Sequence, residues 1–435
     1  MNNPHSFADS PALSVPQRSL LAGKAASPPS LLNRLAKKLV LARLSRLQYG
    51  HLCIVDGDKV MDFGDDDGEL CATLQVHDPR FYAELAFGGS LGAGEAYMLG
   101  YWSADDLTRL VRLMVRNRAL LEQLETGLAR LFMPLVKLLH WMNRNTRSGS
   151  QRNISAHYDL GNDLFELMLD PTMMYSSAIF EHKDMSLEQA SMAKLERICH
   201  KLQLTASDHV LEIGTGWGGF AIYAAQRYGC RVTTTTISRE QYNLACERIA
   251  AAGLSERIEV LLTDYRDLRG QYDKLVSIEM IEAVGYQFYD TYFRRCAALL
   301  KPDGMFLLQG ITIADQNYES ARRSVDFIQR YIFPGSCIPS VTALLDSATH
   351  ASDFRLFDLE DIGPHYATTL ANWRSNFFTQ IEKVRRLGYS EKFIRMWEFY
   401  LSYCEGGFAE RALGDVQLLL VKPLNRRQPL NMHHQ

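Results

Sequence analysis

The chain has 435 residues, enough for two domains with ordinary hydrophobic cores. A formal net charge of −3, with no basic stripe interleaved with aromatic residues, argues against a nucleic-acid-binding protein. The eight cysteines are scattered without a Cys-x-x-Cys pair, so we expect reduced thiols and neither disulfides nor a metal site. The composition favours a cytoplasmic protein.

The first residues, 1–29, are rich in Ser, Pro and Ala, which predicts a disordered segment and not a signal peptide. No uncharged apolar run reaches the roughly 18 residues that a membrane-spanning helix needs. Any contact with a bilayer would therefore be made from its surface.

Residues 30–145 are predicted to form a small α+β domain. In 30–47, leucines recur at helical spacing among Arg and Lys residues without any acidic residue. Two interpretations are open: an amphipathic helix resting on an anionic membrane surface, or a core-packing helix with a solvated basic face. Short apolar runs between residues 49 and 76, broken by Asp and Gly, predict hairpins.

Long apolar helices are expected next, over 107–115 and 120–142. The second contains Pro134 and ends in Trp141 and Arg144, so it is either an interfacial anchor or a kinked helix buried between domains. Residues 143–151, rich in Asn, Arg, Ser and Gly, form the predicted linker.

The remainder, 146–425, is predicted to be a doubly wound α/β domain, followed by a short tail at 426–435. Short apolar strands alternate with helical stretches, as in a parallel sheet that is covered on both faces. Late helices are expected over 368–387 and 390–404. The predicted strands cover residues 210–213, 231–236, 258–262, 274–278, 305–313, 354–359 and 416–421.

A glycine-rich loop directly follows the first of these strands, with the sequence Glu212-Ile-Gly214-Thr-Gly216-Trp-Gly218-Gly219. Glycines let the backbone turn tightly and approach a ligand, and the following helix offers free N–H groups at its start. A nicotinamide cofactor would use a similar turn. However, no acidic residue ends the second strand, where a dinucleotide ribose usually finds a carboxylate; Thr236 and then Gln241 stand there.

The loop resembles motif I of class I methyltransferases, and further motifs resemble those of the cyclopropane fatty acid synthase family. They occur in the family's order, from about residue 50 to residue 375. The matching segments begin at Gly89, Ala156, Tyr175, Thr236, Asp264, Glu279 and His365.

The resemblance implies a site for S-adenosylmethionine. Glu212, Gly214, Gly216 and Gly218 would hold its methionine part, and Tyr175 and Ser176 would cover it from a flap before the sheet. Thr236 and Gln241 would meet the ribose, while Asp264 and Tyr265 would flank the adenine. An aromatic ring stacks well on a purine, and a carboxylate accepts from its exocyclic amine.

The resemblance also implies that a bicarbonate ion acts as the base, in a cage of Glu, His, Tyr and backbone groups beside a Cys. Glu282, Tyr366 and the backbone at Ile311 match this cage, although Glu282 has the alternative of a solvated carboxylate after a strand. Ser177 stands in place of the Cys and Gln309 in place of the His, and Ala283 replaces a second His. We therefore expect Glu282 and Tyr366 to bind an oxyanion or act on the proton directly, with Gln309 as a donor that cannot titrate near neutrality.

The function implied by the resemblance is transfer of a methylene group to the cis double bond of unsaturated phospholipid acyl chains, giving a cyclopropane. Loss of a different proton would give a methylated or methylene-bearing chain instead. An apolar acyl tunnel is expected, with Phe327, Tyr331 and Phe333 in its wall.

The family further implies work at the bilayer surface, on the inner face of the membrane, and a homodimer. Two rival functions are a small-molecule N-methyltransferase, since some plant alkaloid enzymes share the catalytic domain, and a lipid carrier without catalytic activity.

Overall fold

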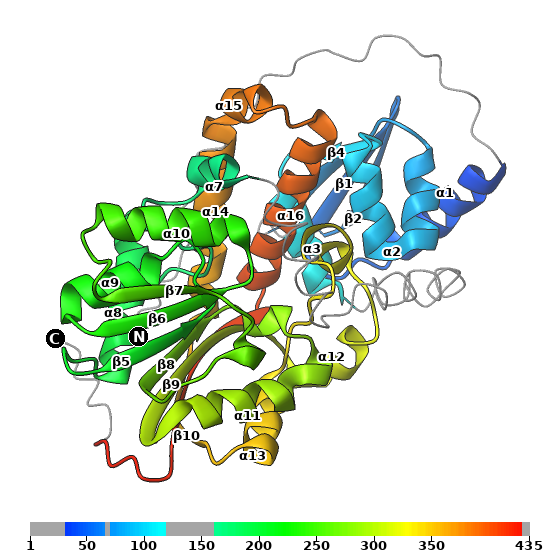
Figure 1. Ribbon diagram of the computed structural model, residues 1–435. Coiled ribbons are helices and arrows are strands. Elements are labelled where there is room, and N and C mark those ends of the chain that lie inside the picture. The colour runs from blue at the N-terminus through cyan, green and yellow to red at the C-terminus, as the bar shows by residue number, and fades with distance from the viewer. Residues whose placement is uncertain (1–30, 66–69, 119–160, 429–435) are drawn as a thin grey trace, which may run out of the picture.

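The computed structural model describes residues 31–65, 70–118 and 161–428, and Figure 1 shows their arrangement. Five of the sequence predictions therefore lie wholly or largely outside the described residues. These are the disordered segment 1–29, the helix over 120–142, the linker over 143–151, the family motif that begins at Ala156 and most of the tail over 426–435.

Within residues 31–65 and 70–118, the front unit comprises a four-stranded sheet and three helices. Its sheet order is β2-β1-β3-β4, with β1 and β2 forming the expected hairpin. β3 pairs with β1 in parallel, so the prediction of hairpins throughout this stretch is wrong for the second connection. The elements are α1 (Leu31–Leu44), β1 (His51–Asp56), β2 (Lys59–Gly64), β3 (Cys71–Val76), α2 (Arg80–Met98), β4 (Trp102–Ala104) and α3 (Leu107–Arg116).

The first helix, α1, packs on the front unit with one face and exposes the other. Ala36, Val40 and Leu44 are buried, whereas Leu31 and Leu35 are more than half exposed. The core-packing interpretation is thus correct for one face, and membrane contact by the other stays a prediction. None of the helices in the described ranges is both long and apolar enough to cross a membrane.

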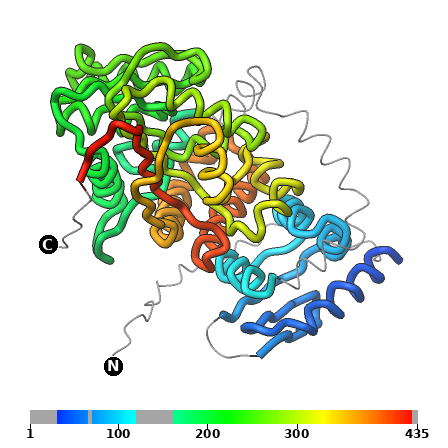
Figure 2. Tube along the Cα trace, turned by 90° about the horizontal axis from the view of Figure 1, so that it is seen from below, coloured from blue at the N-terminus to red at the C-terminus, as the bar shows by residue number. Residues whose placement is uncertain are grey.

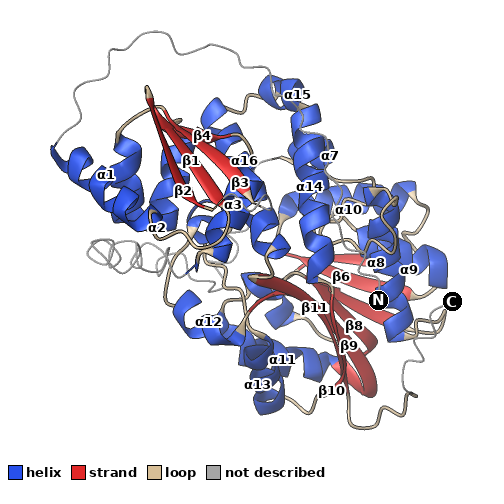
Figure 3. Cartoon of the chain, turned by 180° about the vertical axis from the view of Figure 1, so that it is seen from behind, coloured by secondary structure: helices blue, strands red, loops and turns tan. Residues whose placement is uncertain are grey.

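The second unit is built on a seven-stranded sheet of order β10-β11-β9-β8-β5-β6-β7 (Figure 3). The strands from β9 to β7 are parallel, and β11 runs antiparallel to both of its neighbours. The predicted strands all exist, with ends shifted by a few residues. They are β5 (His209–Ile213), β6 (Arg231–Thr236), β7 (Ile258–Leu262), β8 (Tyr272–Ile278), β9 (Leu300–Ile313), β10 (Arg355–Asp361) and β11 (Leu413–Val421).

Alternate residues of these strands face opposite layers, as the pleat requires. Val210 and Leu307 contribute to the core under the helices α8 and α9, whereas Leu211 and Leu308 contribute to the core under α11 and α13. Both faces of the sheet are therefore covered, which confirms the predicted doubly wound α/β fold. The helices and turns between the strands are α7 (Asn162–Met168), α8 (Leu187–Leu202), α9 (Gly219–Tyr228), α10 (Arg239–Ala251), η1 (Tyr265–Asp267), η2 (Ile281–Ala283), η3 (Tyr286–Phe288), α11 (Tyr289–Leu299), α12 (Asp315–Ala321), η4 (Ile328–Ile332) and α13 (Val341–Ala351).

The last helices differ in their bounds from the expectation. The predicted helix over 368–387 begins earlier and breaks at Gln380, where the backbone leaves the helical region, into α14 (Gly363–Thr379) and α15 (Ile381–Arg386). The final helix, α16 (Glu391–Ala409), starts at Ser390, whose hydroxyl accepts from the amide of Phe393.

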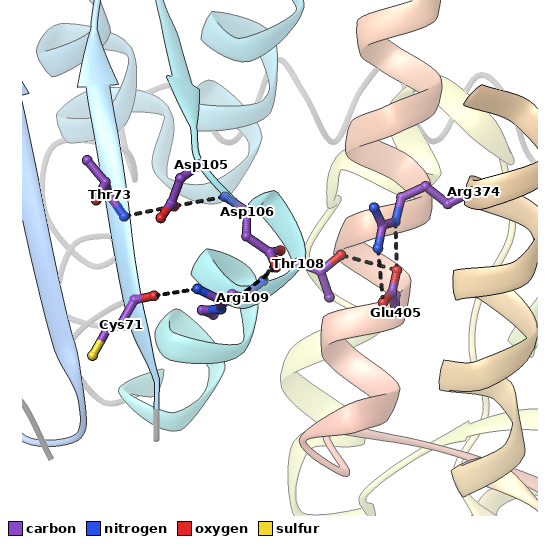
Figure 4. A network of polar contacts seen from close by, with 8 residues as sticks. All are labelled: Cys71, Thr73, Asp105, Asp106, Thr108, Arg109, Arg374 and Glu405. Carbon is purple, nitrogen blue, oxygen red and sulfur yellow. Dashed lines mark hydrogen bonds and ion pairs between the residues drawn. The ribbon is translucent and has the colours of Figure 1, made fainter. Parts of the chain in front are cut away.

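Helix α16 joins the two units, and Figure 2 shows the front unit in blue and cyan against the orange and red end of the chain. A Cβ on Gly406 would lie 2.6 Å from the Val111 side chain, so α16 and α3 approach closely. Glu405 accepts from Thr108 of α3 at 3.1 Å and from Arg374 of α14 at 2.9 Å (Figure 4). One continuous hydrophobic core extends from α1 to α16, so the front unit is not an independent body in packing terms.

Candidate active site

A cavity of about 1380 Å³ opens at the carboxyl ends of the central strands. It extends from the glycine loop after β5 to apolar side chains of the front unit, including Leu52, Leu74 and Trp102. Ligand sites in open α/β sheets lie at this edge. The space is therefore shared by both units.

The glycine loop turns in the way that its residue types predict. Gly214, Gly216 and Gly218 have φ values of +103°, +52° and +85°, which side chains with a Cβ rarely adopt. A Cβ on Gly216 would meet no atom within 4 Å, so the space in front of this backbone is open. The loop can therefore hold a ligand against its backbone, next to the start of α9.

Glu212, at the end of β5, is a buried carboxylate that lines the same cavity. Its Oε2 accepts from the hydroxyl of Thr234 at 2.6 Å. Burial raises the pKa of Glu212 to about 8. A buried carboxylate of this kind is a fitting partner for a ligand ammonium group, because a positive charge nearby would favour the ionised form.

The flap residues Tyr175 and Ser176 line the same cavity as the glycine loop. The Tyr175 hydroxyl forms a hydrogen bond with the Tyr400 hydroxyl at 2.7 Å, and the Ser176 hydroxyl accepts from the Lys194 ammonium at 2.6 Å. Arg248 of α10 donates to the carbonyls of Trp217 and Pro171, at 2.6 and 2.8 Å, and so ties the glycine loop to the start of the flap.

The predicted ribose and adenine residues lie along the same cavity. The hydroxyl of Thr236 donates to Oε1 of Gln241 at 2.8 Å, so these two side chains form a pair at the end of β6. The Tyr265 ring packs edge-on against Tyr292, with centroids 5.3 Å apart. Both carboxylate oxygens of Asp264 accept hydrogen bonds from Arg266, an ion pair that the sequence did not predict. An adenine amine would have to share these oxygens with Arg266.

The polar residues of the predicted cage converge on a carboxylate that the sequence analysis left without a role. Glu279, just after β8, accepts from the Ser177 amide at 2.8 Å, from the Gln309 side-chain amide at 2.8 Å and from the Tyr366 hydroxyl at 2.5 Å. Gln309 also donates to Asp415 at 3.0 Å. The cage is thus assembled around Glu279.

Glu282 stands beside this group and lines the cavity. Its Oε1 accepts from the Ile311 amide at 2.5 Å, whereas its Oε2 is buried without a hydrogen-bond partner among the described residues. Burial, followed by the nearby Glu279, raises the pKa of Glu282 to about 8. Glu282 is thus not the solvated carboxylate of the alternative interpretation.

Comparison with known proteins assigns this arrangement to a family. Residues 145–418 match the family model described as mycolic acid cyclopropane synthetase. The chain belongs to this family. It is 38% identical to the tuberculostearic acid methyltransferase of Mycobacterium tuberculosis, over 94% of each chain. It is 40% identical to the cyclopropane-fatty-acyl-phospholipid synthase of Escherichia coli, over 81% of this chain and 87% of the relative.

A solved mycolic acid cyclopropane synthase, in complex with SAH and CTAB, matches the enzyme's fold with a TM-score of 0.59. The sequences are 30% identical, and the match covers 62% of this chain and 98% of that structure. The protein is an S-adenosylmethionine-dependent methyltransferase. The open glycine backbone and the buried Glu212 fit this cofactor.

The prediction of an aromatic tunnel wall holds only in part for the enzyme. Phe333 lines the cavity, but Phe327 and Tyr331 do not. Phe327 is fully buried beside Gly94 of α2, where an added Cβ would lie 2.5 Å from its ring, and the Tyr331 hydroxyl donates to Glu95. These two aromatic residues therefore connect the front unit to the second unit and do not line the cavity.

Sequence reasoning missed Glu279, Lys194, Asp415 and Arg248 as members of the enzyme's site. Glu279 lies only three positions before Glu282 in the same motif, so the sequence places it near the site. The direction of its side chain could not be predicted from the sequence. Lys194 and Asp415 are buried charges on α8 and β11, in segments that looked like ordinary core elements. No local pattern distinguishes them.

The raised pKa of Glu282 predicts how the enzyme's stability varies with pH. A carboxyl with a folded-state pKa near 8 contributes stability below about pH 4.5, and this contribution is lost as the pH rises through 8. Glu282→Gln removes that loss, so the melting temperature of the variant relative to the wild type is expected to increase between pH 5 and pH 8.5. Thermal unfolding of the ligand-free protein across this range measures it.

The control is Glu256→Gln, at an exposed position, for which the difference from the wild type should stay constant with pH. A Glu282→Gln difference that is equally flat would show that Glu282 is ionised throughout and would contradict the prediction.

Proposed function

We propose that the enzyme transfers a methyl group from S-adenosylmethionine to the cis double bond of an unsaturated acyl chain in a phospholipid, and then removes a proton. The observation that carries this proposal is the cavity. It joins the glycine loop to apolar side chains of the front unit, and both Glu279 and Glu282 line it. A small soluble substrate would need neither the length nor the apolar far end of such a space.

The chemistry requires little covalent participation by the protein. S-adenosylmethionine supplies an electrophilic methyl group. The alkene π electrons form the new carbon–carbon bond as the sulfur–carbon bond breaks, which leaves a positive charge on the neighbouring carbon of the acyl chain. The protein has to hold the alkene in place, exclude water and accept one proton.

Two products differ only in what happens before the proton leaves. If a C–H bond of the transferred methyl breaks at once, its electron pair closes a cyclopropane ring. If a hydride first shifts from the methylated carbon to the cationic one, the same proton loss gives an exocyclic methylene. Both end products contain one additional CH₂ group, and a saturated methyl branch would need a separate reductase.

The exposed face of α1 supports a role at the membrane surface. Leu31, Leu32, Leu35 and Leu39 are exposed along this helix, next to the basic residues Arg34 and Lys38. Apolar side chains flanked by cations fit the headgroup region of an anionic bilayer, where each cation contributes on the order of 1 kcal/mol. Such docking would bring acyl chains to the front unit.

The test uses purified enzyme, unilamellar vesicles of a cis-unsaturated anionic phospholipid, and S-adenosylmethionine with a trideuterated methyl group. Mass spectrometry of the fatty acid methyl esters is expected to show a gain of one CD₂ unit, because one deuterium leaves the transferred methyl. Retention of all the deuterium would place the proton loss elsewhere on the chain.

Vesicles of the saturated phospholipid are the control and should gain no label. Absence of label from the unsaturated lipid, together with methylation of soluble amines and no vesicle binding, would overturn the proposal in favour of an N-methyltransferase.

A further inference from the structure

Glu279 occupies a backbone position that ordinarily suits glycine. Its φ is +48°, one of few positive values for residues with a side chain in the described part of the chain. Such a conformation costs on the order of 1 kcal/mol or more, and residues that adopt it concentrate at functional sites. The cost indicates that the carboxylate is kept here for a reason other than backbone stability.

The surroundings of Glu279 are those of a bound oxyanion. The Ser177 amide and the Gln309 amide group donate to Oε1, and the Tyr366 hydroxyl donates to Oε2. These donors come from the flap, from β9 and from α14. These positions match donors that the family resemblance assigns to a bicarbonate ion, and here the Glu279 carboxylate accepts from all three.

Burial raises the pKa of Glu279 above its ordinary value, and the Tyr366 hydrogen bond, followed by the Lys194 charge, opposes this shift. Burial lowers the pKa of Lys194 to about 8, and Glu279 is the first of the acidic groups that oppose that shift. Burial and the charge of Glu279 hold the pKa of Asp415 well above its usual range. Asp415 is therefore the weaker acid of the two, and Glu279 is the carboxyl that ionises first.

Glu279 also faces the reaction space. It lines the cavity together with Glu282 and Tyr366, whereas Ser177 and Gln309 do not and hold the carboxylate from behind. A carboxylate positioned in this way combines a fixed location with access to a substrate, which are the requirements for a proton acceptor.

We propose that the Glu279 carboxylate replaces bicarbonate as the proton acceptor of this enzyme, an inference that rests on the proposed function above. A C–H bond of the transferred methyl group breaks, and its electron pair neutralises the carbocation as a ring bond or a double bond. The proton passes to the Glu279 carboxylate and later to solvent. No external oxyanion takes part.

The decisive variant is Glu279→Gly, because glycine tolerates the positive φ and leaves a hole of carboxylate size lined by the three donors. In bicarbonate-free buffer its activity is expected to fall by about 100-fold or more, the usual contribution of a general base. Added bicarbonate or acetate should restore at least about a tenth of the wild-type rate. The wild-type enzyme should respond to neither anion.

Glu279→Gln is the matched variant, since its amide fills the same space without being a base. It should lose activity to the same extent and should not be rescued by either anion. S-adenosylmethionine binding, measured by calorimetry, should stay within a few-fold of the wild type in both variants. A purely structural role would predict no anion rescue of Glu279→Gly.

A readout without turnover keeps the inference separate from the proposed function. Line broadening of ¹³C-bicarbonate in the NMR spectrum should appear with Glu279→Gly and be absent with the wild type and Glu279→Gln. Failure of the wild type to methylate lipids would overturn the proposed function alone. Bicarbonate binding by the wild type, or full activity of Glu279→Gly without an anion, would overturn the role of Glu279.

Discussion

Gly216→Val is expected to weaken S-adenosylmethionine binding by about 100-fold, which corresponds to about 2.8 kcal/mol at 1.4 kcal/mol per decade. The space in front of Gly216 is open, so the new side chain would occupy the region where the ligand meets the glycine loop. Isothermal titration calorimetry with S-adenosylmethionine measures the effect.

Gly253→Val is the matched control for this experiment. Gly253 has a φ of +69°, and a Cβ there would also meet no atom within 4 Å, but Gly253 does not line the cavity. Both variants carry a similar backbone strain of about 1–2 kcal/mol and should lose similar thermal stability. Equal loss of binding in both would show that strain, and not the occupied space, weakens binding.

Tyr366→Phe is expected to reduce the rate of methyl transfer by about 10- to 100-fold, because it removes a hydrogen bond to a buried carboxylate. The ring should keep its place, since it stacks on Phe408 with centroids 4.4 Å apart and meets Trp373 edge-on. The measurement is the steady-state rate on unsaturated vesicles, with S-adenosylmethionine binding expected to stay unchanged.

Tyr272→Phe provides the comparison for the loss of a tyrosine hydroxyl. Tyr272 is buried at the opposite end of the sheet, at the start of β8, and its hydroxyl donates to the Arg269 carbonyl at 3.2 Å. Its activity should match the wild type. A Tyr366→Phe enzyme with an equally normal rate would mean that the Tyr366 hydroxyl does not support the reaction.

Local sequence patterns were sufficient to predict most helices and strands of the second unit. The strand over 231–236 agrees to the residue with β6, and the strand over 258–262 with β7. β6 is buried along nearly its whole length, whereas β7 is a partly buried edge strand. Both are short runs rich in β-branched and aliphatic residues, which favour strands. The hairpins of the front unit were harder, because whether β3 pairs with β1 or β2 depends on contacts outside the local sequence.

The apolar residues between 327 and 333 show the same limit in the core. Their spacing predicted that they are buried, but not whether they line the cavity or pack in the protein core. Phe333 lines the cavity, whereas Phe327 packs against Phe399 of α16. Hydrophobic burial is not directional, so a pattern of aromatic residues cannot distinguish a tunnel wall from a contact between two units.

The sequence by itself determined the glycine loop, the order of the strands along the chain and the residue types that the cofactor site requires, because each depends on neighbours in the chain. Only the tertiary structure decided which carboxylate the polar residues surround. Ser177, Gln309 and Tyr366 lie 102, 30 and 87 positions from Glu279. They meet there because the flap, β9 and the start of α14 pack around the residue that follows β8. Hydrogen bonds depend on distance and direction, and these are set by packing.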